Sequence, residues 1–136
     1  MNSIDLRILE SESDVVRIAL VGRLSHDGWP ADFDPLADLI GGDVYGKSVL
    51  LDLARSNYLD SSGVSWLLES NKRFQQAGGA LVLHSATPLT TQFLRMMRMD
   101  LVLLLVTDEA AAREKLNGHQ HSDTAEKSAP RPRRRR

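Results

Sequence analysis

The sequence predicts an α/β fold, in which a mixed sheet of about five strands packs with helices and an N-terminal hairpin begins the chain. Two observations support this prediction. Short segments near the N-terminus alternate apolar and polar residues with period two, and three continuous apolar runs further along are separated by segments of helical period. A chain of 136 residues is long enough for one domain with its own core. We therefore expect a single domain over residues 1–116.

The first two strands are expected at residues 4–8 and 15–20, where apolar side chains occupy every second position. The polar residues 10–14 between them predict a hairpin turn. A short helix is expected from Asp32 to Ile40, because turn-forming residues bound this segment on both sides. The N-terminal third therefore supplies an antiparallel pair of strands and one short helix.

Three later strands are indicated by continuous apolar runs, which are typical of central strands that helices cover on both faces. The runs are Val49–Leu53, Ala80–Leu83 and Leu101–Val106. With the helices predicted between them, the element order is β, β, α, β, α, β, α, β, α. Such alternation is characteristic of an α/β layer fold.

The longest helix is predicted at residues 62–76, because its large apolar residues fall on one face and a glycine pair follows it. A second helix is expected to begin with Thr87 as N-cap and Pro88 in the first helical position. Its apolar stripe is expected to consist of Leu89, Phe93, Met96 and Met97. A third helix is expected at residues 108–116, with acidic residues in its first turn.

The bulk composition, with 42% hydrophobic and 26% charged residues, is typical of a soluble globular protein. The chain has no apolar run of the roughly 18 residues that a membrane span needs. Its N-terminus carries acids early and does not resemble a secretory signal. Cysteine is absent, which excludes disulfides, thiolate metal sites and cysteine nucleophiles. A cytoplasmic location fits these features.

The charge is distributed unevenly along the chain. Residues 1–116 hold 11 basic and 16 acidic groups, a net charge of −5, whereas residues 117–136 hold 6 and 2, a net charge of +4. The second segment has no aliphatic side chain larger than alanine, so it cannot bury enough surface to offset the entropy of ordering. We predict a disordered basic tail over residues 117–136.

Residues 41–48 read GGDVYGKS and match the spacing of a phosphate-binding loop. A working loop needs a buried strand before the first glycine and a helix that starts at the Gly-Lys-Ser. Here a helix is predicted before Gly41 and a strand after Ser48. The match therefore favours a glycine turn between a helix and a strand, and a P-loop nucleotide hydrolase is kept as a less favoured alternative.

The segment LLDLARSNYLDSSGVSWLLESNKRFQQAGGALVL resembles the core of STAS domains, the family of bacterial anti-sigma-factor antagonists. The matching features are a buried strand that ends in Asp52-Leu53, a variable linker, the sequence Asp60-Ser61-Ser62-Gly63-Val64 at the start of a helix, and a glycine pair before the next strand. The likeness extends to residues 21–24 and to Thr87-Pro88, and covers about residues 4–116. It departs at Asp100, where the family often has glycine, and over residues 25–47.

The resemblance implies a partner-switching function. A serine kinase that also binds a sigma factor would phosphorylate Ser61, and the unmodified protein would capture that kinase, so that the sigma factor is released. A phosphatase would reset the system. The resemblance equally allows a nonphosphorylated interaction or scaffold subunit, in a stress-signalling complex or beside a transporter ATPase, in which Asp60 and Ser61 simply cap a helix.

The residues themselves make phosphorylation of Ser61 physically plausible. A phosphate at a helix N-terminus is favoured by the helix dipole, so folding should survive the modification. Beside Asp60 the added charge would disturb a surface that a partner must desolvate. We expect Ser62 and Gly63 to shape this loop and to take part in the partner surface with Asp60.

A helical wheel centred on Val64 places Trp66 about 160° from the core direction. Together with Glu69, Ser70 and Arg73 it would form an exposed stripe that docks the kinase, since surface tryptophans are frequent binding anchors. The alternative is that residues 25–47 cover Trp66.

Other activities have little support in the sequence. A hydrolase based on Ser61 lacks the G-x-S-x-G pattern, and His84 and His26 are the only histidines outside the tail. His119 and His121 are too few for a metal site. The terminal arginines have no interleaved aromatic residues, so direct nucleic-acid binding is not expected. No enzyme activity, cofactor or metal is predicted.

Overall fold

The computed structural model describes residues 4–12, 14–25, 29–30 and 32–117. Its strands are β1 (Asp5–Ser11), β2 (Val15–Leu24), β3 (Ser48–Asp52), β4 (Ser56–Leu59), β5 (Ala80–His84) and β6 (Leu104–Val106). Its helices are α1 (Pro35–Ile40), α2 (Ser61–Ala77), α3 (Pro88–Met96), the short 3-10 helices η1 (Val44–Gly46) and η2 (Met99–Leu101), and a last helix over residues 109–117. Residues 118–136, with His119, His121 and nearly all of the predicted tail, lie outside this description.

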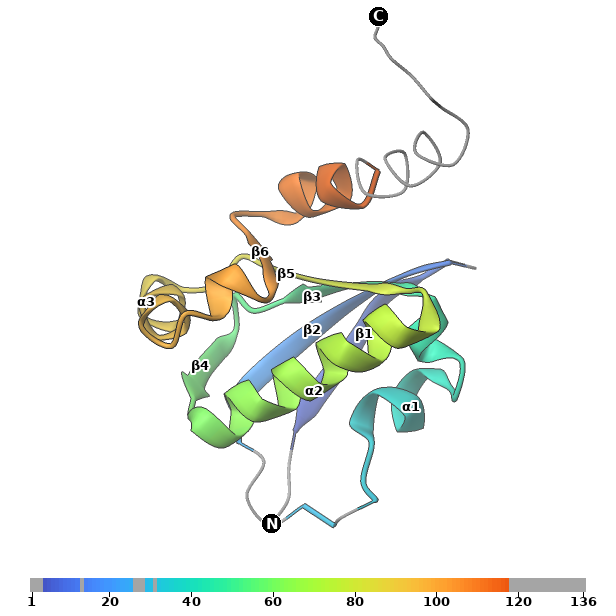
Figure 1. Ribbon diagram of the computed structural model, residues 1–136, viewed down its shortest axis with the longest axis horizontal. Helices are drawn as coiled ribbons and strands as arrows, with labels where there is room; N and C mark the ends of the chain where they lie inside the picture. The colour runs from blue at the N-terminus through green and yellow to red at the C-terminus, as the bar shows by residue number, and fades with distance from the viewer. Residues whose placement is uncertain (1–3, 13, 26–28, 31, 118–136) are drawn as a thin grey trace, which may run out of the picture.

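The strands form one mixed sheet in the order β1-β2-β3-β5-β6 (Figure 1). β1 and β2 pair antiparallel, which confirms the predicted N-terminal hairpin, and the remaining pairs are parallel. β4 pairs with the far end of β2. This strand was not predicted, because its four residues lie in the segment interpreted as a linker. Gly22, at φ +86°, lies where the pairing of β2 with β4 shifts register.

Helices cover both faces of the sheet, as the continuous apolar runs predicted. One core cluster joins α2 to the sheet through side chains such as Leu67 and Phe74, both fully buried. A second cluster joins the last helix to the opposite face, where Leu50 and Val82 contact Ala112 and Leu116. In Figure 1 the last helix and α2 lie on opposite sides of the strands. Each central strand is therefore buried from two sides.

The third apolar run was predicted as a strand from Leu101, but only Leu104–Val106 forms one. Leu101 ends the 3-10 helix η2 and is 75% exposed. In α3, Thr87 caps the helix and Pro88 begins it, as predicted. Thr90 and Leu94 face the core, whereas Leu89, Met96 and Met97 of the predicted apolar stripe are exposed. Because α3 lies at one end of the sheet, the rest of the protein covers only one narrow side of this helix.

The segment GGDVYGKS is not a phosphate-binding loop. Gly41 ends α1, its amide donating to the Ala37 carbonyl, and Ser48 is a buried residue of β3. Between them lies η1, so no helix starts at the Gly-Lys-Ser. The segment connects a helix to a strand, and Gly79 lies so close to it that a Cβ at that position would overlap the Lys47 carbonyl oxygen.

Candidate functional site

Asp60 organises the start of α2 and is the centre of the candidate site. β4 delivers it in an extended conformation, and its side chain accepts a hydrogen bond from the Gly63 amide at 2.9 Å. The Ser62 hydroxyl donates to the same carboxylate oxygen at 2.6 Å, and the Ser25 hydroxyl donates to the other oxygen at 2.8 Å. Asp60 is therefore the N-cap of α2, and it also ties the end of β2 to that helix.

These hydrogen bonds fix the charge of Asp60. Burial raises the pKa of the carboxyl group, but the hydrogen bonds from Ser62, the Gly63 amide and Ser25 outweigh it and lower the pKa to about 2. Asp60 is accordingly an anion at any physiological pH. The Tyr58 hydroxyl donates a fourth, longer hydrogen bond at 3.5 Å. Because its oxygens already accept these hydrogen bonds, the carboxylate is a structural acceptor and is poorly suited to act as a general base.

Ser61 differs from its neighbours. It is the first residue of α2 and is exposed. Whereas Ser62 bonds to Asp60, the Ser61 hydroxyl has no hydrogen-bond partner among the described residues. Its side chain is therefore accessible for modification, and it lies in the first turn, where the helix dipole favours negative charge.

Gly63 has a packing role. It is buried, and a Cβ built on it would overlap the Leu24 carbonyl oxygen and lie 2.9 Å from side-chain atoms of Leu24 and Leu59. The absence of a side chain therefore lets the first turn of α2 approach the end of β2. Gly63 therefore allows this close packing, and it lies beneath the surface that a partner would touch.

The prediction that Trp66 is exposed was wrong. Its side chain is 6% exposed and packs edge to face against Trp29, with ring centroids 5.8 Å apart. Ser70, predicted to share the exposed stripe, is also buried. The helical wheel failed because α2 is covered on two sides, by the sheet and by the segment that precedes α1. The structure therefore agrees with the alternative prediction, in which residues 25–47 cover Trp66.

Arg73 and Glu69 are exposed, but Arg73 is engaged within the molecule. Its guanidinium group forms an ion pair with Asp34 at 2.9 Å and lies over the Tyr45 ring, 5.6 Å from its centroid. Asp34 in turn caps α1 and accepts hydrogen bonds from the Tyr45 hydroxyl at 2.9 Å. Burial and this contact raise the pKa of Tyr45 to about 12. Arg73 thus fastens α1 to α2, and the predicted docking stripe is not one continuous exposed surface.

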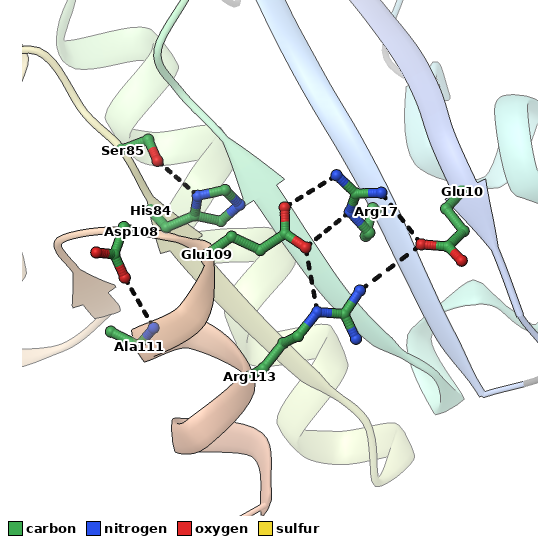
Figure 2. Close-up of polar contacts among 8 residues, drawn as sticks. All are labelled: Glu10, Arg17, His84, Ser85, Asp108, Glu109, Ala111 and Arg113. Atoms are coloured by element: carbon green, nitrogen blue, oxygen red, sulfur yellow. Dashed lines mark hydrogen bonds and ion pairs between the residues drawn. The ribbon is translucent and has the colours of Figure 1, made fainter.

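A polar cluster on the opposite face of the sheet was not predicted (Figure 2). Arg17 on β2 forms ion pairs with Glu10 on β1 and with Glu109 on the last helix, at 3.1 and 2.9 Å. Arg113 bridges the same two carboxylates. The i,i+4 spacing of Glu109 and Arg113 could have indicated one of these pairs. The cluster attaches the last helix to the hairpin.

His84 lies beside this cluster at the end of β5 (Figure 2). It is buried, burial lowers its pKa, and its Nδ1 lies 2.8 Å from the Ser85 hydroxyl. Within the part of the chain that the structure describes, no three histidine, aspartate or glutamate side chains gather as a metal site would require. Among the same residues, no helix is long and apolar enough to cross a membrane.

A family model described as "Mlab, STAS domain" matches residues 9–107, which is most of the chain. No curated protein sequence matches this chain. The matched range contains the end of β1, all of β2, the Asp60 loop and both α2 and α3. It confirms the resemblance that the sequence motif indicated.

Solved structures share the fold. The anti-sigma factor antagonist SpoIIAA in its unphosphorylated form is 20% identical, with a TM-score of 0.61 over 84% of this chain and 97% of that one. The phosphorylated form of SpoIIAA, a Bacillus cell fate determinant, is 20% identical, with a TM-score of 0.55 over 81% and 98%. An anti-sigma-factor antagonist (STAS) domain protein from Planctomyces limnophilus is 21% identical, with a TM-score of 0.53 over 79% and 93%. At these identities the similarity establishes the fold.

Proposed function

The chain belongs to the STAS domain family, and from this premise we propose that it is an anti-sigma-factor antagonist in a partner-switching module. The unmodified protein binds an anti-sigma serine kinase in the cytoplasm, and the kinase then gives up its sigma factor. Phosphorylation of Ser61 by that kinase ends the binding, and a phosphatase restores the unmodified form. The protein has no catalytic activity of its own in this scheme.

The observation that carries the proposal is the contrast between Ser61 and its neighbours. Ser61 is exposed and its hydroxyl has no partner among the described residues, whereas Asp60 and Ser62 are bonded to each other. A kinase can therefore reach Ser61 without breaking the cap of α2. Folding should persist after phosphorylation, because the structural hydrogen bonds belong to Asp60.

The effect on binding follows from charge. A phosphate on Ser61 adds about −1.5 to −2 charge at neutral pH, directly beside a carboxylate that is itself always ionised. A partner that desolvates this surface would have to bury two adjacent negative groups. Phosphorylation would therefore weaken recognition and leave the fold intact. The fold of this chain resembles SpoIIAA in both its unphosphorylated and its phosphorylated forms, which is compatible with such a change.

A second candidate is a nonphosphorylated interaction subunit, in a stress-signalling complex or beside a transporter ATPase. It is favoured by the helix cap that Asp60 forms, which explains Asp60 without any modification. In this function the exposed end of α2 would bind its partner constitutively.

The two candidates differ in what substitution at Ser61 does. We would measure the affinity for the candidate anti-sigma kinase from the same cells by calorimetry, with the unmodified protein and the Ser61→Ala and Ser61→Asp variants. Ser65→Ala is the matched control, since Ser65 is an exposed serine one turn along the same helix. Partner switching predicts that Ser61→Asp loses at least about tenfold in affinity, equivalent to about 1.4 kcal/mol, while Ser65→Ala does not.

Phosphopeptide mass spectrometry of the protein from its native cells, across growth and stress conditions, supplies the second test. Phosphate on Ser61 that varies with condition is the result expected of partner switching. Complete coverage of residues 56–72 without phosphate in any condition, combined with equal affinities of the Ser61 variants, would reject partner switching in favour of the constitutive subunit.

A further inference from the structure

Three of the four residues in the predicted apolar stripe of α3, Leu89, Met96 and Met97, are exposed, and Phe93 is half-buried. Leu89 and Met96, seven residues and two turns apart, lie on one side of the helix, and each is 74% exposed. The side that faces the sheet is formed instead by Thr90 and Leu94, both buried. A surface helix ordinarily buries its apolar stripe and exposes its polar side. In α3 Leu94 is buried, but Leu89 and Met96 are left uncovered.

The turn that follows α3 also exposes apolar side chains. Leu101 in η2 is 75% exposed and Val102 after it is 52% exposed, while Met97 at the end of α3 is 39% exposed. α3 and η2 lie side by side at one end of the molecule, away from α1 (Figure 1). We call the set Leu89, Met96, Met97, Leu101 and Val102 the α3–η2 apolar face. Large exposed apolar side chains gathered in one place mark a surface that something else covers.

Cations border this face. Arg95 and Arg98 are exposed, and neither forms an ion pair with another described residue. Asp100 is the only acidic residue from Ala86 to Val106. An open depression of about 590 Å³ runs along the flank of α3, next to the apolar stripe. It is lined by Ala86, Pro88, Thr91, Gln92, Arg95 and Met96, which offer hydrogen-bond donors and one positive charge but no carboxylate.

We propose that the α3–η2 apolar face docks on the surface of an anionic lipid bilayer. Its apolar side chains would enter the boundary between headgroups and acyl chains, and Arg95 in the depression and Arg98 beyond it would contact lipid phosphates. Arginine suits this border, because its apolar stem lies along the hydrocarbon while its guanidinium group reaches the headgroups.

Two features favour a bilayer over a protein as the occupant. The apolar side chains protrude from a helix and a turn, and a bilayer accepts protruding side chains without a groove of matching shape. The chain also ends in Arg131-Pro132-Arg133-Arg134-Arg135-Arg136, a polybasic segment attracted to anionic lipid. Stable peripheral binding generally needs two such signals, one apolar and one electrostatic.

The test is co-sedimentation of the full-length protein with vesicles of phosphatidylcholine alone or of phosphatidylcholine mixed with phosphatidylglycerol. The protein should bind only the mixed vesicles, and salt should weaken the binding. A Met96→Ser, Leu101→Ser double variant should lose about tenfold or more in partitioning, because two large apolar groups no longer enter the bilayer. Leu39→Ser is the matched control, since Leu39 is an exposed leucine on α1 at the other end of the molecule.

A second variant separates the two signals. Replacing Arg133, Arg134, Arg135 and Arg136 by glutamine should reduce binding to mixed vesicles and flatten its salt dependence, while binding remains sensitive to Met96→Ser and Leu101→Ser. Circular dichroism and thermal unfolding would verify that every variant is folded.

Three results would overturn the proposal. One is that the full-length protein binds neither kind of vesicle at low salt. Another is that the Met96→Ser, Leu101→Ser variant binds mixed vesicles with the same affinity as the unmodified protein. Vesicle binding would then depend on the arginines alone. The third is that the unmodified protein binds no vesicles while the double variant loses self-association or kinase affinity, which would assign the face to a second copy or to a protein partner.

Discussion

The Ser62 hydroxyl donates a 2.6 Å hydrogen bond to the Asp60 carboxylate, and Ser61, between them in sequence, has no hydrogen-bond partner among the described residues. Three consecutive polar residues therefore have separate roles at the start of α2. Asp60 and Ser62 hold the helix end, and Ser61 is left accessible. Changes to the first pair should affect stability, and changes to Ser61 should affect partner binding.

The depressed pKa of Asp60 predicts a particular pH dependence of stability. A carboxyl group whose pKa falls from 3.8 to about 2 on folding stabilises the native state above about pH 4, and this contribution is lost as the pH falls towards about 2. The free energy of unfolding of the unmodified protein should therefore decrease more steeply over this range than that of Asp60→Asn. Urea denaturation at a series of pH values measures the free energy of unfolding of both proteins. Parallel pH dependences would contradict a lowered pKa for Asp60.

Gly63→Ala should destabilise the protein by about 1–3 kcal/mol, the usual cost of forcing an extra group into a packed site. The new Cβ would overlap the Leu24 carbonyl oxygen, so α2 would have to move away from β2. Gly42→Ala is the control, because a Cβ there meets nothing within 4 Å and the change should stay within about 0.5 kcal/mol. Equal midpoints of urea denaturation for the two variants would show that α2 does not pack tightly against β2 at Gly63.

Trp66→Ala should cost about 3–5 kcal/mol of stability, as expected for a buried aromatic side chain. The substitution removes the contact with Trp29 and opens a cavity between α2 and the segment before α1. Leu89→Ala, at a residue 74% exposed, should change stability by no more than about 0.5 kcal/mol. Thermal and urea unfolding would measure the stability of both variants. A Trp66→Ala variant as stable as Leu89→Ala would mean that the Trp66 side chain is accessible to solvent.

Glu109→Gln should loosen the last helix selectively. Glu109 is the carboxylate that contacts both Arg17 and Arg113, at 2.9 and 3.1 Å (Figure 2). Partly exposed ion pairs contribute up to about 1 kcal/mol each, so the loss should be modest and local. Hydrogen exchange should become faster at the amides of Ala112 and Leu116 while α2 remains protected. Glu114→Gln, an exposed acid on the same helix, serves as control and should leave exchange unchanged.

Much of the fold could be predicted because its signals are local. The hairpin follows from period-two alternation, β3 and β5 from continuous apolar runs, and the start of α2 from a capping residue. Gly78, which ends α2 at φ +89°, was recognisable because few other residues adopt that conformation readily. Each of these features depends on residues within a few positions of one another.

The missed features depend on neighbours that are distant in sequence. β4 is short and half polar, and it is a strand because the end of β2 beyond Gly22 pairs with it. Trp66 is buried because Trp29, on a different segment, packs on it. A helical wheel can find the apolar side of a helix, but it cannot tell how many sides are covered.

The sequence by itself therefore determined the family, the order of most elements and the position of Asp60 and Ser61 at the start of a helix, because caps and periodicity are short-range properties of the chain. Only the tertiary structure decided which surfaces are free. It covered Trp66 and left Leu89 and Leu101 exposed, because exposure depends on which distant segments pack against a residue and not on the residue's own hydrophobicity.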